Sequence, residues 1–218
     1  MNSKTKKLTF GAMLCAIAYV VMMLIHIKLV PAAPFLTYDP KDVIIALGGF
    51  IWGPGMAVIV SAVVALVEMV TVSDTGIIGC IMNFISTCSF ALIASFIYKK
   101  RRTLGGAVVG LITGCIAMTC TMLLWNYLLT PLYMNQSREA VAGMLLPIFL
   151  PFNLLKGALN AAMTFLLYRP VVTALRRAGL VEASSNAKAK TTPWIPILGA
   201  VLVIVACVLY ILWLNGII

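Results

Sequence analysis

Three polar residues interrupt an otherwise apolar stretch in the last third of the chain. Asn153, Lys156 and Asn160 are spaced i, i+3 and i+7, so they share one face of a helix. No acidic residue lies within a helical turn of Lys156. Amides both donate and accept hydrogen bonds and an ammonium group donates them, so this face could bind the heteroatoms of a polar ligand. An ionisable residue inside a membrane indicates a functional site.

Other polar residues come from four further segments of the chain, and the topology argued below brings them to the same half of the molecule. A polar group left without a partner in hydrocarbon costs roughly several kcal/mol, so these side chains must bind one another or a ligand. Besides the face around Lys156, the candidates for such a site are Tyr38, Asp39, Glu68, Asn83 and Asn126.

Two interpretations of these residues remain open on the pattern alone. In the first, they form a pocket for a planar ligand that is polar and either neutral or weakly anionic, with aromatic side chains against its faces. In the second, they form a structural network in which Glu68 neutralises Lys156, because buried charges are usually paired.

The composition identifies the environment of these residues. Of 218 residues, 62% are hydrophobic and 10% are charged, whereas soluble domains are about one-quarter charged. The chain is therefore predicted to be a multi-pass membrane protein. The net charge of +10 is interpreted as a topology signal, because the basic residues fall in short segments between apolar spans, and nucleic acid is not an expected partner.

The sequence gives little support to an enzyme. It has no Ser/His/Asp arrangement, no metal-ligand cluster and no G-x-x-x-x-G-K-[ST] nucleotide-binding loop. The six cysteines lie in apolar segments without a C-x-x-C pair, which favours packing over metal binding or disulfides. We expect neither catalysis nor a cofactor, and any energy must come from a partner or a gradient.

Hydropathy predicts an all-α bundle. A span needs about 20 apolar residues to cross the membrane. The second segment is shorter and is separated from the third by Gly53-Pro54-Gly55, and three prolines between residues 31 and 40 exclude a continuous helix there. The predicted segments are 8–30, 42–52, 56–72, 76–98, 104–130, 144–168 and 194–214.

Two prolines bear on the depth of Lys156. Pro147 and Pro151 are expected to delay the regular helix until about Phe152. Lys156 would then lie about one turn into its helix, near the membrane surface.

The basic residues predict the topology. The N-terminus, residues 99–102 and residues 169–190 hold twelve of the sixteen lysines and arginines, and they fall on one side if the spans alternate. Positively charged segments mark the cytoplasmic side. The N-terminus is therefore expected to be cytoplasmic, and the C-terminus and the end of the bundle near Lys156 are expected to be outside.

Small residues predict two close-approach faces. Gly11, Ala12 and Ala16 form such a face on the first span, for a partner or for packing within the chain. Glycines at four-residue spacing form another on the fifth, at positions 106, 110 and 114.

Several short motifs, in this order and spacing, resemble one known family. They are residues 35–42 (FLTYDPKD), 49–55 (GFIWGPG), 82–84 (MNF), 125–127 (WNY) with 131–133 (PLY), and 151–156 (PFNLLK). The chain resembles the riboflavin-binding S components of energy-coupling factor (ECF) transporters over residues 8 to about 178.

This resemblance implies a six-helix substrate-binding domain at 1–178, a cytoplasmic linker at 179–193, and an additional span within 194–218. It implies that riboflavin binds under the first outer loop, with Asn126, Asn153 and Lys156 at the flavin ring. That location adds the loop residues Phe35 and Leu36, beside Tyr38 and Asp39, to the candidates.

The resemblance also implies partners and leaves alternatives. The face with Ala12 and Ala16 is similar to the patch on which these subunits meet a transmembrane coupling protein, which works with two ATPases. Glu68 stands where a neutral or basic residue is expected, and the 194–214 span is additional to the family's fold. The alternatives are an S component for another vitamin, such as thiamine or pantothenate, and a membrane scaffold with a structural polar network.

Overall fold

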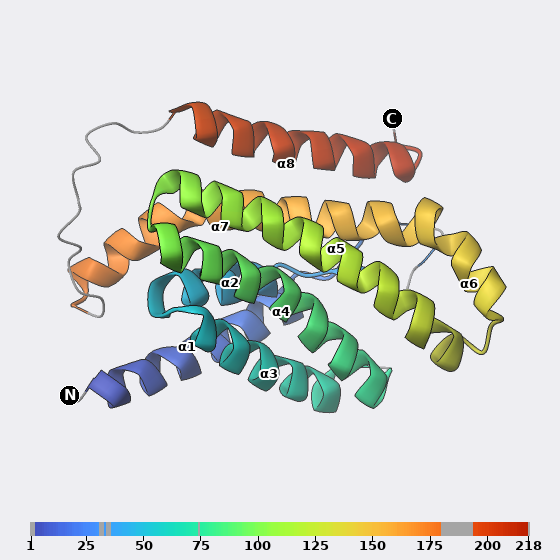
Figure 1. Cartoon of the computed structure of the whole chain (residues 1–218), viewed down its shortest axis with the longest axis horizontal. Coiled ribbons are helices and arrows are strands. Elements are labelled where there is room, and N and C mark those ends of the chain that lie inside the picture. Colours follow the sequence, from blue (N-terminus) through green and yellow to red (C-terminus); the bar gives the residue numbers. More distant parts are fainter. Residues whose placement is uncertain (1–2, 31–32, 34–35, 74, 180–193, 218) are drawn as a thin grey trace.

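A computed structural model describes residues 3–30, 33, 36–73, 75–179 and 194–217. The described chain is almost entirely helical, which confirms the predicted fold class. The helices run side by side along the long axis of an elongated bundle (Figure 1). Within the described residues, six helical segments are long and apolar enough to cross a membrane.

The first helix ends earlier than the sequence predicted. Helix α1 covers Ser3–Leu24, not a span reaching Val30. The backbone then becomes extended, and strand β1 (Ile27–Lys28) pairs antiparallel with β2 (Thr37–Tyr38). The predicted loop is thus part of a short hairpin, whose strands satisfy each other's backbone groups.

The short second segment is a buried helix. Helix α2 (Lys41–Trp52) packs against α1, α4, α7 and α3 (Pro54–Thr71). Gly53 has φ 96°, a conformation that favours glycine, and Pro54 occupies the first turn of α3. The Gly-Pro-Gly sequence therefore makes a tight turn between α2 and α3.

Helices α4 (Gly76–Arg101) and α5 (Leu104–Met134) form the most extensive pair. A Cβ atom on Gly110 would lie 2.7 Å from the carbonyl oxygen of Ala94, and one on Gly114 would lie 2.6 Å from that of Phe90. These glycines let the two backbones approach closely. Gly106 instead faces the α4–α5 turn, so two of the three glycines of the predicted close-approach face contact α4.

The helix that carries Lys156 begins much earlier than predicted. Helix α6 (Arg138–Met144) continues through the π-helical turn η1 (Leu145–Phe149) into α7 (Leu150–Arg177). Pro147 lies in η1, where the wider turn accommodates a residue without an N–H group, and Pro151 lies in the first turn of α7. The regular α-helix α7 starts close to the predicted Phe152, but the prediction that Lys156 lies about one turn into its helical segment was wrong, because eighteen residues of helical chain precede it.

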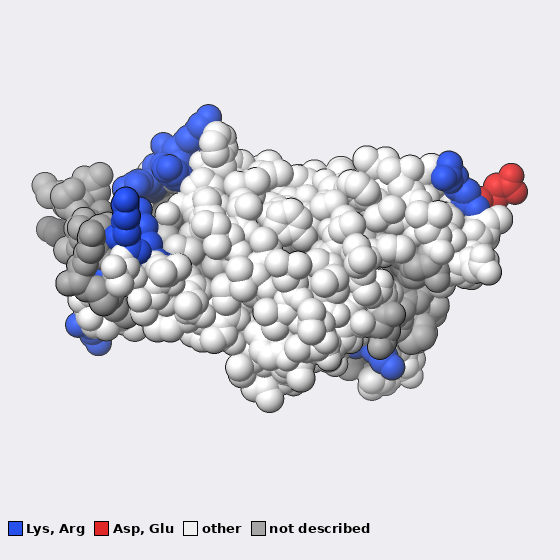
Figure 2. Space-filling view, turned by 90° about the horizontal axis from the view of Figure 1, so that it is seen from below, with Lys and Arg blue, Asp and Glu red and all other residues white. Residues whose placement is uncertain are grey.

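The two ends of the bundle differ in charge. The N-terminal end of α1, the α4–α5 turn and the C-terminal end of α7 lie at one end (Figure 1), and most of the basic residues visible in Figure 2 gather there. Helix α7 continues through Pro170 to Arg177, so the first part of the basic segment is helical. The opposite end carries the α3–α4 turn and α6.

Helix α8 (Trp194–Leu214) lies against α7. Its inner face, with Ile204, Cys207 and Ile211, packs with Phe152 and Leu155 of α7. The rest of this helix is exposed and apolar, as expected for a span facing lipid. Almost all of the predicted linker, residues 180–193, lies outside the described residues.

Candidate functional site

A cavity of about 470 Å³ lies between the hairpin, the α3–α4 turn, α5 and α7. Its volume falls in the range of roughly 300–1,000 Å³ that is usual for small-molecule sites. It lies toward the end of the bundle opposite the basic segments, because its walls include the α3–α4 turn. The cavity therefore joins residues that are far apart in the sequence.

One wall consists of amides, a lysine and an aromatic ring from α5 and α7. It is formed by Asn126, Phe152, Asn153 and Lys156. The amide nitrogen of Asn126 donates to the carbonyl oxygen of Met122 at 2.7 Å, and that of Asn153 donates to the carbonyl oxygen of Phe149 at 2.7 Å. Each bond reaches one turn back along its own helix and fixes the side chain at the cavity wall.

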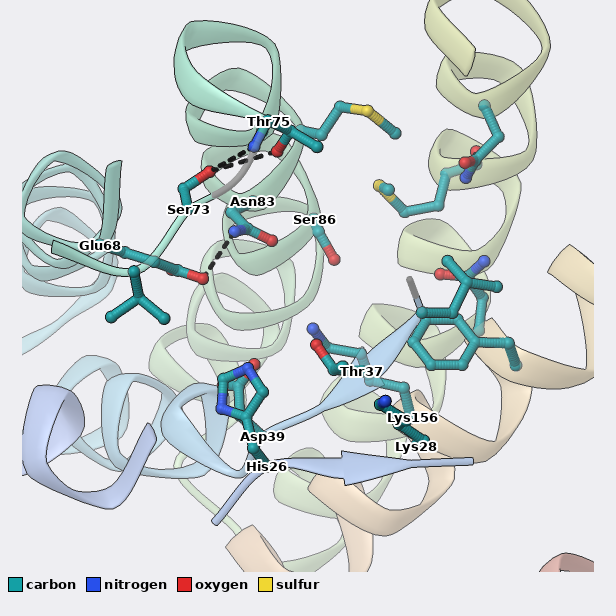
Figure 3. A pocket seen from close by; sticks show the side chains of 18 residues that line it. His26, Lys28, Thr37, Asp39, Glu68, Ser73, Thr75, Asn83, Ser86 and Lys156 are labelled. Atoms are coloured by element: carbon teal, nitrogen blue, oxygen red, sulfur yellow. Dashed lines mark hydrogen bonds between the residues drawn. The ribbon is translucent and has the colours of Figure 1, made fainter. Parts of the chain in front are cut away.

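The facing wall carries a carboxylate, hydroxyl groups and another amide. Glu68, Ser73, Thr75 and Asn83 lie together on one side of the cavity, across from Lys28 and Lys156 (Figure 3). Asn83 donates to a carboxylate oxygen of Glu68 at 2.8 Å, and the Ser73 and Thr75 hydroxyl oxygens lie 3.2 Å apart. Such a wall could bind hydroxyl groups of a ligand, because it offers both donors and acceptors.

Five charged residues behind and along these walls are almost completely buried. We call Asp39, Lys41, Asp42, Glu68 and Lys156 the buried charge cluster. Lys41 is shared between two carboxylates, with its ammonium nitrogen 2.6 Å from Glu68 and 3.4 Å from Asp39. Removing either partner would leave a buried charge without full compensation, which is costly.

The partner of Lys156 is Asp42. The Lys156 ammonium lies 3.7 Å from Oδ2 of Asp42, which also accepts a hydrogen bond from the amide of Asn160 at 3.1 Å. The other carboxylate oxygen, Oδ1, accepts a hydrogen bond from the Thr87 hydroxyl at 2.7 Å. The alternative interpretation, in which Glu68 neutralises Lys156, was wrong, because Glu68 pairs with Lys41. Helix α2 packs between α3 and α7, and its first two residues, Lys41 and Asp42, each provide one of the counter-charges.

Tyr38 and Asn160 lie beneath the cavity and do not line it. The Tyr38 hydroxyl donates to the amide oxygen of Asn160 at 3.1 Å, which ties β2 to α7. Burial, together with the nearby carboxylates of Asp42 and Asp39, raises the pKa of the Tyr38 hydroxyl, so it remains a donor at neutral pH. These two residues hold the hairpin against the bundle.

Asp39 is charged in spite of its burial. Burial alone would raise its pKa, but the ammonium groups of Lys41 and Lys156 outweigh this effect and lower it. The backbone N–H of Lys41 also donates to Asp39 at 3.3 Å. Asp39 and Glu68 are the two acidic residues that line the cavity in the described part of the chain.

Comparison with known proteins identifies the architecture. The family of ECF transporter substrate-specific components (S components) matches residues 6–168. The chain belongs to this family. This S component is a multi-pass protein of the cell membrane, and it is a transport subunit.

Named relatives match the S component over most of their lengths. It is 35% identical to the riboflavin transporter RibU of Staphylococcus aureus (strain TCH60), over 80% of this chain and 94% of that protein. It is 30% identical to the riboflavin transporter FmnP of Bacillus subtilis (strain 168), over 76% and 91% of the two chains. A solved structure of the S component of a bacterial ECF transporter superposes with a TM-score of 0.67 at 34% identity, covering 80% of this chain and all of that one.

The structure brings together most of the site residues predicted from the sequence. Seven of them line the cavity, whereas Phe35 lies outside the described residues. The seven are Leu36, Asp39, Glu68, Asn83, Asn126, Asn153 and Lys156.

Other residues at this site of the S component were missed. Lys41 and Asp42 stood at the start of an apolar segment, where charged residues usually meet water, and nothing local indicated burial. The cavity also includes His26, which directly precedes the hairpin, and Lys28 and Thr37 of the hairpin. A signal was available for Asp42: Lys156 required a counter-charge, and the chain has six acidic residues in all.

Proposed function

We propose that this S component binds riboflavin in the cavity and delivers it inward when docked on an ATP-driven coupling module. The observation that supports this most directly is the chemistry of the two facing walls. The wall with Asn126, Asn153 and Lys156 suits the carbonyl oxygens and ring nitrogens of a flavin, and Phe152 offers an apolar face. The wall with Ser73, Thr75 and Asn83 suits the hydroxylated ribityl chain.

The names of the relatives support the same ligand. Two proteins at least 30% identical to this chain are named riboflavin transporters, and each is matched over more than nine-tenths of its length. The proposed site consists of residues that line the cavity and of residues that support its walls. Asn126, Asn153 and Lys156 bind the ring, and Tyr38 and Asn160 hold the hairpin in place.

The proposed orientation puts the cavity toward the outside. The basic segments at the other end of the bundle support a cytoplasmic N-terminus, by the positive-inside rule, and a C-terminus outside after α8. The proposed domain organisation is a binding domain at 1–178, a basic linker at 179–193 and an additional span within 194–218. Riboflavin would enter from the outside, next to the hairpin.

The proposed docking surface is on α1. Ala12 and Ala16 are exposed on this helix, one turn apart, which suits close approach by a helix of the coupling protein. Gly11 is half-buried instead, and a Cβ there would lie 3.2 Å from the sulfur of Met56 on α3. We therefore propose that the two alanines contact the coupling protein and that two ATPases bound to it supply the energy.

Ligand-linked stabilisation tests the proposed substrate. The unfolding temperature of the purified protein is measured with riboflavin, thiamine or pantothenate, since a ligand that binds the folded state stabilises it. We expect riboflavin alone to raise it. A rise with another vitamin instead would reassign the substrate, and no rise with any of them would favour a structural polar network.

A further inference from the structure

The buried charge cluster holds two ammonium groups and three carboxylates. Lys156 forms an ion pair with Asp42, and Lys41 forms ion pairs with both Asp39 and Glu68. Counted over these five side chains, the cluster therefore carries one negative charge in excess. This excess is not spread over a solvated surface, because all five side chains are buried, and salt screens such charges only weakly.

Glu68 places this excess charge at a defined wall of the cavity. Its two carboxylate oxygens are held separately, one by Lys41 at 2.6 Å and the other by Asn83 at 2.8 Å. The backbone N–H of Ser73 also donates to the carbonyl oxygen of Glu68 at 3.0 Å, which joins the α3–α4 turn to the same wall. The carboxylate is thus fixed beside the hydroxyl groups of Ser73 and Thr75 (Figure 3).

We propose that Glu68 is a specificity-determining residue, which makes this S component select uncharged riboflavin over its phosphate monoester. This inference rests on the proposed function, in which the ribityl chain lies along the wall with Glu68. A hydroxyl group at the end of that chain can donate to a carboxylate or accept from Asn83. A phosphate carries about −1.5 to −2 charges at pH 7 and only accepts hydrogen bonds when fully ionised, so Glu68 repels it.

The lysines at the cavity do not offset this repulsion. Lys156 lies on the other side of the cavity, with its charge opposed by Asp42 at 3.7 Å. Lys28 lines the cavity from the hairpin but is exposed, where its attraction for an anion is weakened by water and salt. In the described part of the chain, the wall that holds Glu68, Ser73 and Thr75 presents no cationic side chain to the cavity.

The test compares the dissociation constants of riboflavin and of its phosphate monoester for the full-length protein, by quenching of flavin fluorescence. We expect the phosphate ester to bind at least about tenfold more weakly, the size expected of one charge acting over several ångströms at an effective dielectric constant of about 20. Glu68→Gln should reduce this ratio about tenfold. Glu139→Gln is the matched control, because it removes one carboxylate from an exposed position on α6, and it should leave the ratio unchanged.

A second variant adds charge to the same wall without disturbing the ion pairs. Ser73→Lys should also reduce the ratio, even if Glu68→Gln does not fold. Equal affinities for the two flavins in the unmodified protein, or an unchanged ratio in a riboflavin-binding Glu68→Gln or Ser73→Lys protein, would overturn this inference alone. Absence of riboflavin binding to the unmodified protein would overturn the proposed function as well.

Discussion

The ammonium nitrogen of Lys156 lies 3.7 Å from a carboxylate oxygen of Asp42, which is completely buried near the start of α2. The two residues are far apart in the sequence, and α2 brings them together because it packs against α7. Lys156 thus lines the cavity, and its charge is compensated by Asp42, which does not line the cavity. Because its charge is already compensated, this lysine can donate hydrogen bonds to a neutral ligand and does not require an anionic one.

Replacing Asp42 should destabilise the free protein. Asp42→Asn keeps the shape of the side chain but removes the charge that opposes Lys156 and weakens the bonds from Thr87 and Asn160. Breaking a buried pair in this way costs about 3 kcal/mol or more of unfolding free energy. Unfolding of the ligand-free protein in detergent should show the loss, whereas Glu139→Gln should have little effect. Equal stabilities of Asp42→Asn and the unmodified protein would contradict the role given to this pair.

Replacing Lys156 should weaken riboflavin binding. Lys156→Ala removes one charge-assisted hydrogen bond to the flavin ring, worth roughly 1.5–3 kcal/mol, so the dissociation constant should rise about tenfold or more. Lys99→Ala is a suitable control, since Lys99 is exposed at the other end of the bundle. Fluorescence titration of both variants measures the effect. If Lys156→Ala folds and binds riboflavin as tightly as Lys99→Ala does, the ring is not bound by this lysine.

The surface of α1 should matter for transport and not for binding. Ala12→Trp places a large side chain on the exposed face that we assign to the coupling protein. Riboflavin binding by the isolated subunit should be unchanged, because the cavity lies elsewhere, whereas uptake with the coupling module should fall at least about tenfold, since close helix approach requires small residues. Ile116→Trp, on an exposed face of α5, is the control. Normal uptake by Ala12→Trp would remove α1 from the interface.

Acid should remove the contribution of Asp39 to stability. Its pKa is lowered in the folded protein, because the ammonium groups of Lys41 and Lys156 outweigh the effect of burial. A lowered pKa means that the stabilisation is fully present above the ordinary value of about 3.9 and is lost as the pH falls through the folded value. The stability difference between the unmodified protein and Asp39→Asn should therefore be constant from pH 5 to 8 and shrink below about pH 4. A difference that changed between pH 6 and 8 would contradict this assignment.

The helices were predictable from the sequence because hydropathy and turn residues act locally. Each of the seven predicted apolar segments contains a helix, and α8 has the predicted bounds, although α1 ends at Leu24 and the helical chain before Lys156 starts at Arg138. The start of the helix carrying Lys156 was not predictable from Pro147, because a proline can end a helix or be accommodated in a π-helical turn. The sequence does not distinguish these outcomes.

Most residues of the site were predictable from the sequence, but the ion pairs between its charged residues were not. Asn126, Asn153 and Lys156 were found because polar residues in an apolar helix are conspicuous, and all three line the cavity. The partners of Lys156 and Glu68 were missed because Lys41 and Asp42 sit at the start of a helix, where charge usually indicates solvent. Their burial depends on how α2 is enclosed by its neighbours, which is a property of the tertiary structure.

Binding of riboflavin in the cavity by the amides of α5 and α7 is the proposal on which the others depend. It is tested most directly by titrating riboflavin into the purified, ligand-free protein and into its Asn126→Ala/Asn153→Ala variant while flavin fluorescence is measured. We expect saturable quenching with one riboflavin per chain, and a dissociation constant raised at least about tenfold in the variant, since each lost hydrogen bond contributes about 1 kcal/mol. Quenching that does not saturate, or an equal dissociation constant in a folded variant, would contradict it.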